Sequence, residues 1–277
     1  MTIPVFSLIV LVVSLLAGFL GALTGLGGGV VVTPVLTLML GVDLHYAMGA
    51  SLVSVIATSS GAAAAYVKEG YSNIRTGMLL EIATTAGAVV GAHLTTLVPA
   101  EALAILFGAV LLYSAWHSMH EIPPVAANAA DPLAVKLRMN GSYPGPSGPE
   151  EYQVAKVKMG FGLMTVAGLI SGLLGIGSGA LKVVAMDQVM KIPFKVSTAT
   201  SNFMIGVTAA ASAGIYLRRG YIQPGLAMPV MLGVLAGSLI GARFLSRAPV
   251  KTLRRLFAVV IAVMAVEMIY SGVTGGL

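Results

Sequence analysis

The sequence contains no cysteine, and only 9% of its 277 residues are charged. Without cysteine it has no disulfide framework, no thiolate metal site and no cysteine nucleophile. Soluble domains carry about 25% charged residues, whereas 57% of this chain is hydrophobic and its mean hydropathy is +0.94. The composition therefore excludes a water-soluble globular protein.

Residues 1–42 carry no charge, and they lack the basic region and cleavage site of a secretory signal. We interpret the first segment as a retained membrane helix. A spanning helix needs about 20 apolar residues, so the chain has room for roughly ten. The net charge of +6 comes from basic residues scattered between apolar runs, which indicates membrane topology. We expect a lipid bilayer as partner and no nucleic acid.

Residues 150 positions apart match in one register, which predicts an internal duplication. The matching pairs include Gly18 with Gly168, Gly25 with Gly175, Gly27 with Gly177, Gly29 with Gly179, Ser51 with Ser201, Tyr66 with Tyr216, and Pro99 with Pro249. We expect a first membrane repeat at residues 1–119, a linker at 120–155 and a second membrane repeat at 156–277. The linker is too polar and proline-rich to span a membrane.

Each half contains five apolar segments. They fall at about 3–24, 30–40, 48–67, 76–97 and 102–117, and at about 158–174, 180–190, 198–217, 226–245 and 256–271. The second segment of each half is too short to cross a ~30 Å hydrocarbon core at 1.5 Å per residue. Because it follows a glycine cluster, we expect a broken or re-entrant helix that lines a cavity.

Counting each short segment as one crossing gives each half an odd number of membrane crossings. The second half would therefore cross the membrane in the opposite orientation to the first. The predicted fold class is an all-α integral membrane protein of two inverted repeats. This topology places twelve basic residues on one face: Lys68, Arg75, Lys136, Arg138, Lys156, Lys158, Lys191, Lys195, Arg247, Lys251, Arg254 and Arg255. The positive-inside rule makes that face cytoplasmic and both termini extracytoplasmic. If the short segments re-enter without crossing, the basic residues divide eight against six and predict no orientation.

The strongest local motif is the duplicated glycine cluster, Gly25-Leu26-Gly27-Gly28-Gly29 and Gly175-Ile176-Gly177-Ser178-Gly179. A helix that begins inside the membrane presents free N–H groups and a positive dipole end, which suit an anion. The candidate ligands here are Gly27, Gly28, Gly29, Gly177, Ser178 and Gly179. The alternative is that the glycines only permit close packing of helices.

Polar residues at the start of the third segments are further candidates for substrate binding. They are Ser51, Thr200, Ser201 and Asn202. Such groups are costly in hydrocarbon without partners, and their hydroxyls and amide suit an oxyanion. Helix–helix hydrogen bonding or N-capping explains any one of them equally well.

Six ionisable residues lie inside apolar segments: Glu81, His93, Lys182, Asp187, Arg243 and Glu267. Lys182 follows Gly179 by three residues, so we expect it to supply positive charge to an anion site. The alternative is an ion pair with Asp187. Glu81 could carry a coupling proton, but we interpret it as a boundary carboxylate that reaches the interface. Interface anchoring also accounts for His93, Arg243 and Glu267.

These motifs resemble the TauE/SafE family, described as sulfite exporters and also called toluene-sulfonate uptake permeases. The resemblance rests on the two glycine breaks, on Pro34, on the Ala-x-Gly-Ala-Ser and Ala-Thr-Ser starts of the third segments, and on the run from Asn202 to Gly206. It implies transport, by export, of sulfite or an organosulfonate. The chain departs from symmetry at Ser178 and Lys182, where the first half has Gly28 and Val32.

We therefore predict a secondary transporter that moves a small sulfur anion across the plasma membrane by alternating access. A passive anion channel is the alternative within transport. An intramembrane enzyme would need a nucleophile facing an acid or base, and the sequence has no His-Glu-x-x-His or Gly-x-Gly-Asp motif. We expect no catalytic residue, metal or cofactor. The small-residue run at 61–65 would permit a homodimer.

Overall fold

The computed structural model describes residues 3–119, 131–145, 148–244 and 250–275. It is mainly helical. The long helices are α1 (Ile3–Thr24), α3 (Leu44–Lys68), α4 (Ile74–Leu94), α5 (Ala100–Met119), α7 (Val157–Leu174), α9 (Phe194–Arg218), α10 (Pro224–Phe244) and α11 (Val250–Thr274). The expectation of a helical membrane protein is confirmed, and each predicted apolar segment corresponds to a helix.

The two short segments form interrupted helices. Helix α2 (Gly29–Pro34) continues into a π-helical turn at Val35–Met39, and α8 (Gly179–Val184) continues into another at Ala185–Val189. Pro34 has no N–H with which to continue an α-helical ladder, and the wider turn begins directly after it. A single 3-10 turn at Thr95–Leu97 follows α4.

Five helical stretches of the described residues are long and apolar enough to cross a bilayer. They are Pro4–Thr24, Leu44–Lys68, Ile74–Leu97, Val157–Leu174 and Pro224–Phe244. Large apolar side chains are exposed along the bundle, with Leu8 62% and Ile82 65% exposed. An apolar surface of this kind marks contact with lipid.

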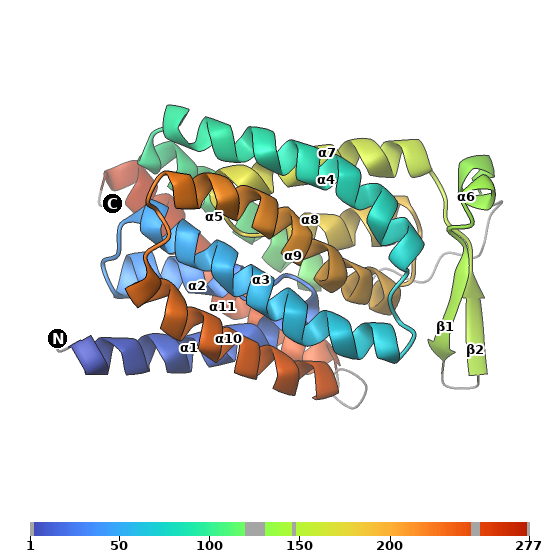
Figure 1. Cartoon of the computed structure of the whole chain (residues 1–277), viewed down its shortest axis with the longest axis horizontal. Coiled ribbons are helices and arrows are strands. Elements are labelled where there is room, and N and C mark those ends of the chain that lie inside the picture. Colours follow the sequence, from blue (N-terminus) through green and yellow to red (C-terminus); the bar gives the residue numbers. More distant parts are fainter. Residues whose placement is uncertain (1–2, 120–130, 146–147, 245–249, 276–277) are drawn as a thin grey trace.

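Helices of the two halves pack side by side in pairs. Figure 1 shows α1 beside α10 and α4 beside α7, with α3 and α9 between these pairs. A methyl group at Gly237 would lie 1.9 Å from the Leu15 carbonyl oxygen, and one at Gly87 would lie 2.2 Å from that of Thr165. Glycine therefore permits backbone contact between helices. The residues of these two contacts lie 150 positions apart.

The part of the predicted linker that the structure describes is ordered. It contains α6 (Pro132–Lys136) and an antiparallel hairpin of β1 (Gly141–Gly145) and β2 (Gly148–Tyr152). Its prolines indicated irregular chain, but Pro144 faces Pro149 in a two-stranded ribbon, where an outward edge tolerates a residue without an N–H. Figure 1 shows both chain termini at the end of the bundle opposite the hairpin.

Asn73 attaches the linker to the membrane bundle. Its Nδ2 donates to the Met139 carbonyl oxygen at 2.6 Å and to the Tyr152 hydroxyl at 2.8 Å. Its Oδ1 accepts from the Thr76 N–H at 3.0 Å and so caps the N-terminus of α4. One side chain therefore starts a membrane helix and holds the hairpin against it.

Replacing Gly237 with alanine should destabilise the bundle. The added methyl would meet the Leu15 backbone, and overpacking of this kind costs about 1–3 kcal/mol. The matched control is Gly214→Ala on α9, where a methyl group has open space and alanine is favoured over glycine by about 0.5–1 kcal/mol. Thermal unfolding in detergent should show a lower Tm for the first variant and an equal or higher Tm for the second. Equal shifts in both would contradict the close contact.

Two substitutions of Asn73 should separate its roles. Asn73→Ala removes the helix cap, worth about 1 kcal/mol, together with both bonds to the linker. Asn73→Asp keeps a capping oxygen and loses the amide donor. Limited proteolysis should cleave residues 131–155 faster in both variants, while only the alanine variant should lose the stability of the cap. Unchanged cleavage in the aspartate variant would show that the amide does not hold the hairpin.

Candidate functional site

Left-handed backbone produces both helix interruptions. Gly25 and Gly27 have φ of 73° and 81°, and Gly175 and Gly177 have φ of 63° and 77°, a region that glycine enters without steric cost. Ser178 has φ 51°, whereas Gly28 at the matching position has φ −65°. A non-glycine residue in this conformation stores strain, which is concentrated at functional sites.

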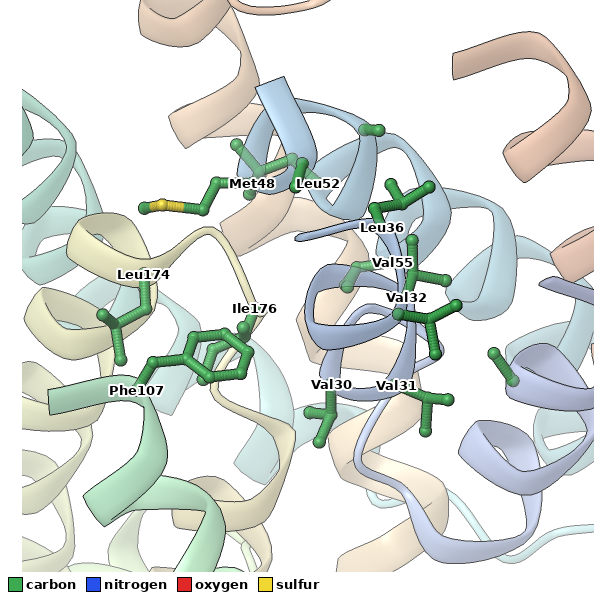
Figure 2. Packing of buried hydrophobic residues seen from close by; sticks show 14 of the residues in the cluster. Val30, Val31, Val32, Leu36, Met48, Leu52, Val55, Phe107, Leu174 and Ile176 are labelled. Carbon is green, nitrogen blue, oxygen red and sulfur yellow. The ribbon is translucent and has the colours of Figure 1, made fainter. Parts of the chain in front are cut away.

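Helix α2 is buried on every side. All six of its residues are buried, and Figure 2 shows Val30, Val31 and Val32 projecting from it in different directions, with Val55 of α3 alongside. A helix that is apolar all round belongs inside a protein or a membrane. The first break is therefore in the interior of the bundle.

The two breaks contact each other there. A methyl group at Gly179 would lie 2.3 Å from the Gly25 carbonyl oxygen, and one at Gly177 would lie 2.5 Å from Cγ1 of Val55. Val55 also contacts Gly27, and a methyl group at Gly29 would meet Ser51 Oγ at 2.3 Å. The predicted residues Gly27, Gly29, Ser51, Gly177 and Gly179 thus lie together although they come from both halves.

Some polar groups at the breaks serve the backbone. The Ser201 hydroxyl lies 3.0 Å from the Gly25 carbonyl oxygen and 3.2 Å from that of Gly179, and donates to these acceptors. Asn202 Nδ2 donates to the Ala22 and Thr198 carbonyl oxygens, both at 3.2 Å. The Gly28 N–H donates to Thr58 Oγ1 at 3.1 Å. These contacts match the structural alternative considered from the sequence.

Two tyrosines complete this backbone support. Tyr66 OH donates to the Ala22 carbonyl oxygen at 2.8 Å, and Tyr216 OH donates to that of Gly172 at 3.1 Å. Each acceptor lies in the last turn of the helix before a break, where carbonyl groups lose their helical partners. In the sequence, these tyrosines indicate only how the two halves align. Their matched positions before equivalent loops were the signal for a structural role.

Other polar atoms near the breaks have no hydrogen-bond partner among the described residues. They are Oγ1 of Thr33, Oγ of Ser51, Oγ of Ser178, Oγ1 of Thr198 and Oδ1 of Asn202, all buried. Thr198 contacts Gly25 and Ser51 contacts Gly29. A buried unpaired polar group costs free energy and calls for an explanation. Of these, the hydroxyls of Ser51 and Thr198 lie against the first break and that of Ser178 belongs to the second break, so three hydroxyl groups at the breaks are available to a ligand.

Thr200 lies on a different face of α9 from these groups. Thr198, Ser201, Asn202 and Ile205 follow the spacing of one helical face, which contacts the breaks. The Thr200 hydroxyl instead accepts from the Asn73 N–H at 2.9 Å. It lies beside the start of α4 and the linker.

Lys182 is completely buried, and its partner is Glu81 of α4. The Nζ–Oε2 distance is 3.2 Å, and Glu81 is only 8% exposed. The interpretation of Glu81 as an interface carboxylate is wrong, because it lies about two turns inside α4 and faces α8. The ion pair joins residues 101 positions apart, whereas the partner considered from the sequence, Asp187, is five positions from Lys182.

Hydroxyl groups surround this ion pair. Thr84 Oγ1 donates to Glu81 Oε2 and Thr85 Oγ1 to Glu81 Oε1, both at 3.0 Å. Thr208 of α9 bridges the two charges, since it accepts from Lys182 Nζ and donates to Glu81 Oε1. The cluster of Glu81, Lys182, Thr84, Thr85 and Thr208 is neutral overall and fully hydrogen-bonded at the carboxylate.

The chemistry that this arrangement supports is binding by hydrogen bonds. Within the described ranges, no three His, Asp or Glu side chains come together as metal ligands. The hydroxyls at the breaks are small neutral donors, and the nearby ion pair is internally neutralised. Such groups suit an oxyanion, whose oxygen atoms accept several hydrogen bonds at once.

The sequence pattern of the family described as "Sulfite exporter TauE/SafE" matches residues 10–268. Among curated proteins, the chain is 27% identical over 272 residues to "Probable membrane transporter protein YunE" of Bacillus subtilis, covering 96% of this chain and 98% of that protein. It is 28% identical over 243 residues to "Probable membrane transporter protein YdhB" of the same organism, covering 87% and 91%.

A "Probable membrane transporter protein" of Xylella fastidiosa is 25% identical over 259 residues, with 92% of each chain covered. No solved structure matches the chain. The family pattern extends across the interrupted helices, the ion pair and the lipid-facing helices described above, and the relatives match over nearly their whole length. The chain therefore belongs to the TauE/SafE sulfite exporter family, a family of membrane transporters rather than enzymes, and is a multi-pass membrane protein.

Proposed function

We propose that this protein is a secondary transporter that carries sulfite or an organosulfonate across the plasma membrane. The observation that carries the proposal is the group of buried hydroxyls without partners at the two breaks, on Ser51, Ser178 and Thr198. A hydroxyl can rotate to donate to an anion. The family description adds the substrate class.

In this proposal the anion binds between the breaks, held by N–H groups at Gly28, Gly29, Ser178 and Gly179 and by the hydroxyls of Ser51 and Ser201. Of these groups, the Gly28 N–H and the Ser201 hydroxyl are bonded within the protein in the described conformation and would exchange those partners for the anion. In the described conformation, Gly179 lies directly against Gly25. Substrate entry therefore requires the two halves to separate. A closed contact at the centre of the bundle is what alternating access predicts for a state between the two open ones.

We also infer that the two halves are inverted repeats. The odd number of apolar segments in each half supports the inversion, and reciprocal contact supports a twofold relation: Gly18 faces the Val234 carbonyl oxygen and Gly168 faces that of Thr84, with each partner 150 positions from its counterpart. Two halves related by a pseudo-twofold axis produce such pairs. Rocking of one half against the other would then expose the same site to either side.

The proposed orientation places the hairpin in the cytoplasm, and the family description supports export as the direction of transport. Lys195 lies over the Tyr71 ring at 5.9 Å, and Arg75 donates to the Arg138 carbonyl oxygen at 3.5 Å, so these basic residues gather beside the linker. Arg219 binds the Ala92 carbonyl oxygen at 2.7 Å, next to the 3-10 turn after α4. The positive-inside rule assigns the end of the bundle with more basic residues to the cytoplasm.

Flux of labelled sulfite into proteoliposomes tests the function. We expect saturable uptake that is competed by sulfoacetate and taurine, and acceleration by unlabelled sulfite on the opposite side. Counterflow of this kind distinguishes a carrier from a passive channel. Absence of flux for sulfite, sulfonates, sulfate and thiosulfate, from protein shown to be folded, would overturn the proposed substrate class.

The hydroxyl of Ser51 allows a sharper test. Because it is buried without a partner, Ser51→Ala should leave the Tm unchanged or raise it, while the apparent KM for sulfite should rise by about tenfold, the effect of losing roughly 1.4 kcal/mol of binding. The matched control is Ser54→Ala on the same helix, whose hydroxyl donates to the Ser51 carbonyl oxygen at 2.8 Å. An unchanged KM for Ser51→Ala would remove this residue from the site.

A further inference from the structure

The ion pair between Glu81 and Lys182 interrupts the correspondence between the halves. The residues 150 positions from Lys182 and Glu81 are Val32 and Met231, so an apolar pair stands at the corresponding position. Thr58, which corresponds to Thr208, accepts from the Gly28 N–H at the first break. Thr208 is instead bound to both charges. The ion pair, with Glu81 from the first half and Lys182 from the second, therefore has no charged counterpart.

The ion pair lies next to the proposed anion site. Lys182 N–H donates to the Ser178 carbonyl oxygen at 3.0 Å, so the lysine is one turn from the strained serine whose hydroxyl has no partner. Helix α8 therefore carries both a proposed anion ligand and the buried ammonium. The ammonium is occupied by the carboxylate, so it is not free to bind an anion while Glu81 is ionised.

Charge balance decides what can happen when an anion arrives. A buried unpaired charge is costly, and removing one partner of a buried pair is strongly destabilising. An anion added to an ionised Glu81 and a charged Lys182 would leave one excess negative charge in the interior. If a proton binds Glu81 at the same time, the lysine pairs with the anion and the cluster stays neutral.

We propose that Glu81 is the proton-coupling residue of this transporter: its protonation releases Lys182 to bind the substrate anion, so that one proton and one monovalent anion cross together. The inference rests on the proposed function and adds its coupling ion. The proton binds a carboxylate oxygen of Glu81, the contact from Lys182 Nζ breaks, and a contact from Nζ to the anion forms. Both leave on the opposite side, and the ion pair re-forms.

The surrounding hydroxyls satisfy both states of the carboxylate. Thr84, Thr85 and Thr208 donate to ionised Glu81, and a hydroxyl can also accept from a protonated carboxyl group. Neutral Glu81 therefore keeps hydrogen-bond partners after Lys182 leaves. Neutralisation in place is also far less costly in the interior than movement of a bare charge.

Lys182 of α8 is the ion-pair partner of Glu81. The other charged groups on the elements packed around Glu81 lie elsewhere on those elements. Those on α4 and the neighbouring α7 and α9 are Arg75, His93, Lys158, Lys195 and Arg218, all exposed, and the half-buried Asp187 lies in the π-helical turn after α8. Glu267 on α11 is exposed. Among the described residues of the membrane helices, Glu81 is the buried carboxylate, and its contact with Lys182 connects it to the proposed site.

The direct test is proton uptake during anion binding by the purified full-length protein. Sulfite and an organosulfonate are each titrated into protein in weakly buffered detergent solution at several pH values. The sulfonate group keeps its charge over this range, so its titration separates proton uptake by the protein from selective binding of bisulfite. We expect close to one proton taken up per anion bound at pH values where Glu81 and Lys182 form the ion pair. The apparent affinity should fall by about tenfold per pH unit in that range, the slope for one coupled proton.

The variant Glu81→Gln mimics the protonated residue. We expect it to bind sulfite without proton uptake, with an affinity that no longer depends on pH. In proteoliposomes a pH gradient should drive accumulation in the unmodified protein and fail to do so in this variant. Glu267→Gln, which removes an exposed intramembrane carboxylate, should keep both the proton uptake and the response to the gradient.

Each result has a distinct meaning. Sulfite binding by the unmodified protein without proton uptake overturns the coupling and leaves the transporter proposal standing. Proton uptake that persists in Glu81→Gln assigns coupling to another group and overturns the role of Glu81. If the anion panel fails to bind the folded unmodified protein, the proposed function fails and the coupling fails with it. Because uptake is measured first on the unmodified chain, the test does not depend on the folding of a variant.

Discussion

Broken backbone inside a hydrocarbon environment needs hydrogen-bond partners, and much of this structure supplies them. The last turns before the two breaks lose carbonyl partners, and Tyr66 and Tyr216 reach across from α3 and α9 to replace them. Ser201 does the same for Gly25 and Gly179. Because an unsatisfied backbone polar group in lipid costs several kcal/mol, α3 and α9 must lie beside the breaks.

The same constraint explains why buried polar groups gather near the breaks while the surface is apolar. Leu8 and Ile82 project outward, while hydroxyls and amides gather at the centre, where they serve the breaks or remain available. Close contact between helices depends on glycine, since backbone atoms of α10 and α1 approach at Gly237 without a side chain between them. Tight outer pairs thereby hold the interrupted helices in the middle.

The ion pair of Glu81 and Lys182 is a buried pair of charges with no charged counterpart at the corresponding positions, Met231 and Val32. The change from Val32 and Met231 to Lys182 and Glu81 is compensated, because both members differ together and the interior stays neutral. Neutrality also links the two proposals. An anion that takes the place of the carboxylate can do so without net charge only when a proton accompanies it.

Segment positions and the family could be recognised from the sequence, because they depend on hydropathy and on short glycine motifs. The internal repeat, inferred from residues such as Gly25 and Gly175 that recur in one register, stays a prediction. The hairpin at residues 141–152 was missed, since Pro144 and Pro149 indicate irregular chain unless their pairing is known. The sequence also placed Gly29, Ser51 and Gly179 at a common site, and these residues do lie together.

The sequence by itself determined that the chain lies in a membrane and where its helices are interrupted, because length, hydropathy and glycine content act locally. Tertiary structure alone decided the partners. Lys182 pairs with Glu81, 101 residues away, and Thr200 faces Asn73 rather than the breaks. Pairing of buried charges depends on which helices become neighbours, and that packing is a property of the whole bundle.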